Sequence, residues 1–133
     1  MALQFSVAVR NARLDATETV VGVTPKLRLY TGTPPADCAA ATTGTLLVEL
    51  TLPSDWMSNA SGGVKALTGT WSGTATTGGT AGYFRLFDSA GTTCHEQGTV
   101  AATGADMNLS PSAVLAASQP ISITAFSLTD ANA

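Results

Sequence analysis

Short runs in which apolar and polar residues alternate, separated by turns rich in glycine and proline, fill the sequence from residue 26 onward. A period of two is the pattern of a strand that buries one face. Roughly six to eight such runs, with turns every eight to twelve residues, predict a mainly β protein built as an antiparallel β-sandwich. The pattern does not choose between an immunoglobulin-like sandwich and a jelly roll. The expected strands cover 26–30, 46–52, 64–71, 83–88, 92–100, 107–109 and 121–128.

Residues 72–81 consist almost wholly of Gly, Thr, Ala and Ser, which favours an exposed loop. A turn is expected at 88–91, where aspartate comes first and glycine last. Near Ala125 the alternation changes phase, which indicates a β-bulge. The strongest strand, 46–52, is expected to carry one continuous apolar face. That face consists of Leu46, Val48, Leu50 and Leu52.

The segment 3–21 has a helical period instead, and Gly22 followed by Pro25 is expected to end the helix. One apolar stripe consists of Phe5, Val9, Ala12, Ala16 and Val20, and an adjoining set of Leu3, Val7, Leu14 and Val21. A stripe this wide predicts that the helix packs on the sheet or on a neighbouring subunit. The expected organisation is therefore a helix or arm over 1–24 and one β-sandwich domain over 25–133.

Charged residues make up 11% of the chain, whereas an ordinary soluble domain carries about a quarter. Such a surface is expected to be partly covered by other protein. The six Lys and Arg residues are scattered, which argues against nucleic-acid binding, because a basic stripe is needed to neutralise phosphates. No run approaches the ~20 apolar residues of a membrane span. Without a basic and then apolar leader, the chain is expected to stay in the cytoplasm where it is made.

No arrangement of residues indicates catalysis, so we expect no catalytic residue, no metal site and no cofactor. The one histidine, His95, follows Cys94 directly, and neighbours on a strand point to opposite faces. With two cysteines and one histidine, the chain lacks the four Cys or His ligands of a structural zinc site. The scattered carboxylates lack the aromatic, polar groove of a glycosidase.

Cys38 and Cys94 are the only cysteines. In a reducing cytosol the default is two free thiols that behave as small apolar side chains. A disulfide could form once the protein reaches an oxidising medium. Spacing alone does not decide between these states.

Four segments of the chain resemble a family of small structural proteins of tailed-bacteriophage virions. They are 5–15 (FSVAVRNARLD), 30–35 (YTGTPP), 50–57 (LTLPSDWM) and 82–95 (GYFRLFDSAGTTCH). Similar proteins look like particle components that are often encoded among head and neck genes. The resemblance transfers no functional residue to this sequence.

The resemblance implies a virion protein that is assembled in the host cytoplasm, and we expect a capsid decoration (cement) protein. Its partners would be the major capsid protein and copies of itself, and low charge suits such contacts. The alternatives are a low-copy neck, tail or fibre component, or a receptor- or glycan-binding module that uses Trp56, Trp71 and Tyr83. The candidate partner contacts lie in the N-terminal segment. They are Leu3, Phe5, Val7, Arg10, Arg13 and Leu14.

Overall fold

A computed structural model describes residues 3–131, which form one helix followed by nine short strands. The chain is mainly β with one N-terminal helix, as the alternating pattern predicts. In chain order the elements are α1 (Val7–Val21), β1 (Lys26–Thr31), β2 (Leu46–Thr51), β3 (Val64–Ala66), β4 (Ser72–Thr74), β5 (Gly79–Phe87), β6 (Cys94–Ala101), β7 (Met107–Ser110), β8 (Val114–Leu115) and β9 (Pro120–Thr129).

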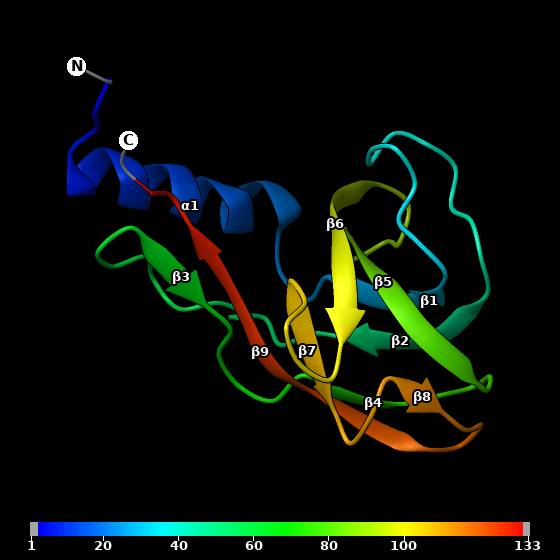
Figure 1. The fold of residues 1–133 in the computed structure, drawn as a ribbon. Helices are drawn as coiled ribbons and strands as arrows, with labels where there is room; N and C mark the ends of the chain where they lie inside the picture. The colour runs from blue at the N-terminus through cyan, green and yellow to red at the C-terminus, as the bar shows by residue number, and fades with distance from the viewer. Residues whose placement is uncertain (1–2, 132–133) are drawn as a thin grey trace.

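The strands form one mixed sheet that curls into a half-barrel (Figure 1). Its path is β2-β1-β5-β6-β7-β9-β3, with β4 paired to β9 and β8 paired to β5. β6 and β7 run parallel, whereas β1, β2 and β5 pair as antiparallel neighbours. The curl is compatible with a sandwich, but the two-layer sandwich itself stays a prediction.

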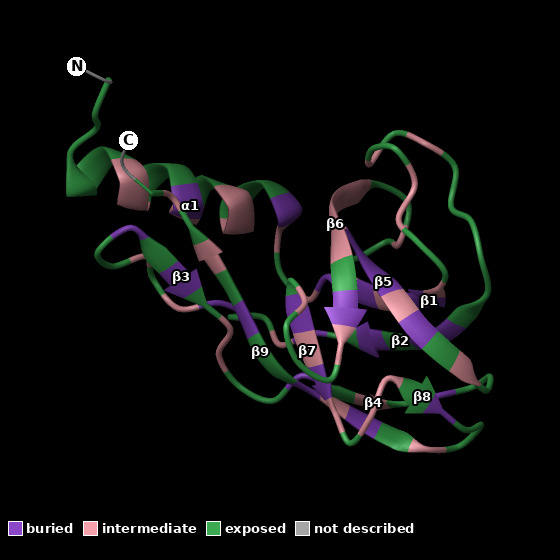
Figure 2. Ribbon diagram, in the orientation of Figure 1, coloured by how far each residue is buried: buried purple, intermediate pink, exposed green. Residues whose placement is uncertain are grey.

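The core cluster joins residues of β1, β2 and β5 with residues of β7 and β9, and Figure 2 shows buried positions along these strands. Phe84 of β5 meets Phe126 of β9 edge-on, with the ring centroids 5.6 Å apart, and Trp71 packs on the same Phe126. Trp56 is fully buried, and its indole Nε1 donates a hydrogen bond to the Gly22 carbonyl at the end of α1. These aromatic contacts connect β5, β9 and the end of the helix.

Helix α1 begins later than the sequence pattern predicts. Ser6 is its N-cap, and the Ser6 hydroxyl accepts a hydrogen bond from the Val9 amide. The predicted helical residues 3–5 therefore precede the cap. The expected end at Gly22 is confirmed: Gly22 has φ +88°, and its N–H donates to the Glu18 carbonyl.

The apolar face expected for 46–52 is wrong at its first position. Leu46 is exposed and Leu47 is fully buried, because the pairing of β1 with β2 shifts register at this point. Tyr30 pairs with Leu46, while Leu29 pairs with Val48, so Leu47 is the extra residue of a bulge. A bulge turns the side chain inward and resets the alternation.

The expected loop over 72–81 is also wrong, since β4 occupies its start and β5 its end. The small residues there reflect close packing. A Cβ added to Gly73 would lie 3.1 Å from Leu50 Cγ, because β4 runs directly beneath β2. The neighbouring strand expected over 64–71 is shortened to β3, and Trp71 lies outside it.

The β5–β6 hairpin and the β9 bulge confirm the sequence predictions. Phe84 and Leu86 face the core, and the turn closes through a hydrogen bond from the Gly91 amide to the Asp88 carbonyl. The register of β9 against β7 shifts between Ile123 and Ala125, which places the bulge at the expected change of phase. The two-residue strand β8 has no alternation long enough to predict.

One carboxyl group faces the core without a hydrogen bond. Glu96 pairs with Leu86 across β5 and β6, and cross-strand partners share a face. Its Oε2 is buried and has no hydrogen-bond partner in the described structure. Burial raises the pKa of Glu96 to about 7, from an ordinary value of 4.5. The folded protein therefore favours the protonated carboxyl.

We expect the stability of the protein to fall as the pH rises from about 4.5 through about 7, because the unfolded chain releases the Glu96 proton first. The variant Glu96→Gln should match the wild type near pH 4 and exceed it by on the order of 2–3 kcal/mol near pH 8. Urea unfolding at both pH values measures the difference. A difference that does not change with pH would contradict the assignment.

Candidate interaction surface

Helix α1 is held to the sheet by a polar inner face. Lys65 of β3 is only 1% exposed, and its Nζ lies 2.8 Å from Asp15 Oδ1 and 3.7 Å from Glu18 Oε2. The same ammonium donates to the Ser58 carbonyl at 2.8 Å. The Asp15 carboxylate also accepts a hydrogen bond from the Ala60 amide. A buried ammonium requires such partners, so Lys65 fixes which side of α1 faces inward.

Further polar contacts connect the first half of α1 with Gly63, just before β3, and with Asp130, just after β9. Asn11 Oδ1 accepts from the Gly63 amide, and the Arg10 guanidinium donates to the Asp130 carbonyl at 3.0 Å. Arg13 forms an ion pair with the Asp130 carboxylate at 3.1 Å. The first half of α1 therefore lies beside the residue that follows β9, as Figure 1 shows.

The opposite face of α1 is apolar and open to solvent. Val9 is 42% exposed and Val20 is 68% exposed, and Val23 beyond the helix is 63% exposed. Along this face, six exposed residues of the helix carry no charge. Those residues are Ala8, Val9, Ala12, Ala16, Thr19 and Val20, which we call the outer face of α1. Of the two packings expected for the apolar stripe, the one on the sheet is wrong for Val9, Ala12, Ala16 and Val20, because the carboxylate side of the helix faces the buried ammonium of Lys65.

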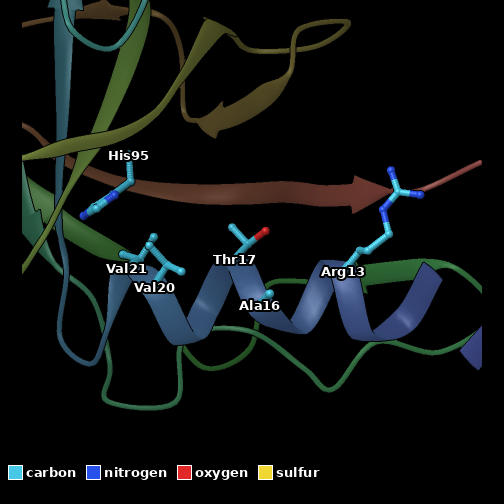
Figure 3. A pocket seen from close by; sticks show the side chains of 6 residues that line it. All are labelled: Arg13, Ala16, Thr17, Val20, Val21 and His95. Atoms are coloured by element: carbon cyan, nitrogen blue, oxygen red, sulfur yellow. The ribbon is translucent and has the colours of Figure 1, made fainter. Parts of the chain in front are cut away.

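A groove runs along one edge of the outer face (Figure 3). It has a volume of about 310 Å³ and is bounded by α1 on one side and by His95 of β6 on the other. Val20, Val21 and His95 converge at one end, while Arg13 extends past the other. Ala16 and Thr17 form the floor between them. A helix face with a hollow beside it can accept a protruding apolar side chain of another protein.

The structure divides the six predicted contact residues into accessible and internal groups. Leu3 is 77% exposed, and Phe5 and Val7 also remain exposed. Arg13 lies over the Phe5 ring, with its guanidinium carbon 4.9 Å from the centroid. In contrast, Leu14 is buried and packs inward.

Arg10 is likewise committed within the chain, to the Asp130 carbonyl. Apolar periodicity identified the helix but left open whether Ala12, Ala16 and Val20 face the sheet or a neighbouring subunit, and none of them is among the six candidate contacts. The signal that could have found them is the pair Asp15 and Glu18, one helical turn apart on the opposite side.

The aromatic residues considered for glycan binding are not on the surface. Trp56, Trp71 and Tyr83 are each at most 1% exposed, and the first two stack in the core. Across residues 3–131, no group of three or more His, Cys, Asp and Glu side chains gathers to hold a metal ion. Within the same residues, no helix is both long and apolar enough to cross a membrane.

A scan against protein-family models, a search of curated proteins and a search of solved structures each find no match for this chain.

The variant Asp15→Asn should lower the stability of the protein, because it removes the nearest carboxylate from the buried ammonium of Lys65. Adding Lys65→Met should restore part of the loss, since methionine needs no charged partner. Denaturant unfolding of the single and double variants measures both effects. As a control, Arg13→Gln removes a half-exposed arginine from its ion pair with Asp130 and should cost less, about 1 kcal/mol. An Asp15→Asn variant as stable as the wild type would contradict the role of this pair.

The same contact predicts an acid-sensitive attachment of α1. The hydrogen bond from Lys65 and that from the Ala60 amide hold the pKa of Asp15 below its ordinary value of 3.8. A lowered pKa in the folded protein adds stability above about pH 4, which is lost as the pH falls through the folded pKa. We expect the amide protection factors of α1, taken relative to the intrinsic exchange rate at each pH, to fall before those of β5 as the pH falls below about 4. Simultaneous loss of both elements would contradict this order.

Proposed function

We propose that this chain is a structural protein that binds other protein subunits through the outer face of α1. The observation that carries the proposal is the orientation of the helix. Its carboxylates pair with the buried ammonium of Lys65, while the uncharged apolar side faces solvent next to a groove. Exposed apolar surface of this kind marks interaction sites in soluble proteins. Protein interfaces also deplete charge at their centres, which suits the composition.

The assembly that we propose is a bacteriophage particle, with this chain as a capsid decoration protein. The support for the phage assignment is the resemblance carried by residues 5–15, 30–35, 50–57 and 82–95. In this role the outer face of α1 would contact the major capsid protein, and copies of the chain would meet one another on the shell. Residues 3–6 precede the helix and extend the exposed apolar surface through Leu3 and Phe5.

A charge placed on the outer face of α1 should prevent incorporation into particles. Val9→Asp introduces a negative charge near the N-terminus of α1, and Val20→Lys introduces a positive charge near its C-terminus. The helix dipole favours both charges, so folding is preserved. Each should lower the number of copies per particle at least about tenfold, because an unpaired charge in an apolar contact costs more than ~1.4 kcal/mol. Quantitative mass spectrometry of particles from a phage carrying each allele gives the copy number.

Val114→Asp is the matched control, since Val114 is an equally exposed valine on β8, at the other end of the molecule from α1. It should leave the copy number unchanged. A wild-type copy number of about a dozen or fewer would indicate a neck, tail or fibre component and would contradict the decoration role. Equal losses for all three variants, or release of the wild type by salt alone, would contradict an apolar interface on α1.

A further inference from the structure

A second buried layer lies on the side of β5 that faces away from the core. Tyr83 and Arg85 of β5 are almost completely buried, yet neither belongs to the core cluster. The segment 35–43, which we call the covering loop, lies over them. Tyr83 Oη donates to the Thr43 carbonyl and accepts from the Thr43 amide. The face of the sheet that alternation assigns to solvent is therefore closed by the chain itself.

Arg85 is the main anchor of the covering loop. Its Nη2 donates to the carbonyls of Asp37, Cys38 and Ala40, and its Nη1 donates to Thr42 Oγ1 at 2.7 Å. The bond to the Cys38 carbonyl is 2.9 Å long. A buried guanidinium that makes these bonds fixes the loop, and with it the position of the Cys38 side chain.

Cys94 lies on the same face, at the start of β6. It pairs with Phe87 across the hairpin, while Arg85 pairs with Gln97 further along. Gln97 also binds the loop, through a hydrogen bond to the Pro35 carbonyl at 2.7 Å. The loop thus crosses the β5–β6 hairpin on the face that carries Cys94, and the bond from Arg85 to the Cys38 carbonyl places Cys38 over that same face.

We propose that Cys38 and Cys94 are a thiol–disulfide site, which closes into an intramolecular disulfide in an oxidising thiol pool and fastens the covering loop to β6. Both thiols are free in this structure and half-buried. The proposal rests on the positions of the loop and hairpin and is independent of the docking role of α1.

The reaction is thiol–disulfide exchange with oxidised glutathione as the oxidant. The Cys38 thiolate attacks the glutathione disulfide and releases one glutathione thiolate. The Cys94 thiol then loses its proton to solvent, attacks the Cys38 sulfur and releases the second glutathione thiolate. Both leaving thiolates take up protons, so two protein thiols and one oxidised glutathione give one disulfide and two reduced glutathiones.

The surroundings of Cys94 assign the order of the two steps. Burial raises the pKa of Cys94 to about 11, and the contact with Cys38 acts in the same direction, while Arg85 opposes the rise. At neutral pH Cys94 is therefore protonated, and the first attack belongs to Cys38. The exchange should accelerate as the pH rises.

The test oxidises the full chain with glutathione disulfide near pH 8, alkylates the remaining thiols and measures the intact mass. The expected product has lost two hydrogens, takes up no alkylating agent, stays intramolecular and yields a peptide linking Cys38 to Cys94. The bond would close a loop of about 55 residues, which predicts a folding equilibrium constant about a thousandfold larger and a Tm raised by roughly 10 °C.

Cys38→Ser and Cys94→Ser are the matched controls, because each leaves one thiol and should gain no stability on oxidation. The oxidised and reduced wild type also form a comparison within one sequence, which is valid even where a variant folds poorly. The proposal is overturned if both thiols of the wild type remain open to alkylation. It is equally overturned if oxidation gives only glutathione adducts or disulfide-linked dimers.

Discussion

The buried ammonium of Lys65 is the constraint on which the arrangement of this molecule depends. A charge held at 1% exposure must have partners, and α1 supplies them through Asp15 and Glu18. Because these carboxylates lie on one side of the helix, they must face β3. Of the apolar residues of α1, Leu14 and Val21 are then buried, whereas the outer face of α1 lies outside the core. The exposed surface that we assign to partner binding is therefore the consequence of an internal ion pair.

A second buried cation shapes the other end of the molecule in a similar way. Arg85 lies on the outward side of β5, and its two terminal nitrogens donate to three carbonyls and a hydroxyl of the covering loop. The loop in turn buries Tyr83, whose ring stacks on Tyr30 with centroids 5.1 Å apart. In a chain with so few charged residues, two are therefore buried: Lys65 orients the helix, and Arg85 holds the covering loop.

Local patterns predicted the elements of the fold better than their orientation. Neighbouring residues determine the alternation around Phe84 and Leu86 and the end of the helix at Gly22. Both features can therefore be predicted directly from the sequence. The outward direction of Val20 depends instead on Lys65, which lies far along the chain. The helix could therefore be predicted from the sequence, but not which of its sides faces solvent.

The errors in the β region have a related cause. Leu47 is buried because a bulge shifts the pairing with β1, and a bulge leaves little trace in a run of apolar residues. Gly73 looked like part of a loop, yet it is small because β4 approaches Leu50 closely. The covering loop leaves no local pattern either, since only the fold brings Cys38 and Cys94 to the same face of the β5–β6 hairpin.

The central claim is that the outer face of α1 is covered by another subunit in the assembled particle. A cryo-electron microscopy reconstruction of virions that contain this protein tests it most directly. The account predicts that Val9 and Val20 contact a neighbouring protein, while β8 at the other end of the molecule is free of that contact. A reconstruction in which the protein is ordered and the outer face of α1 points into solvent would contradict it.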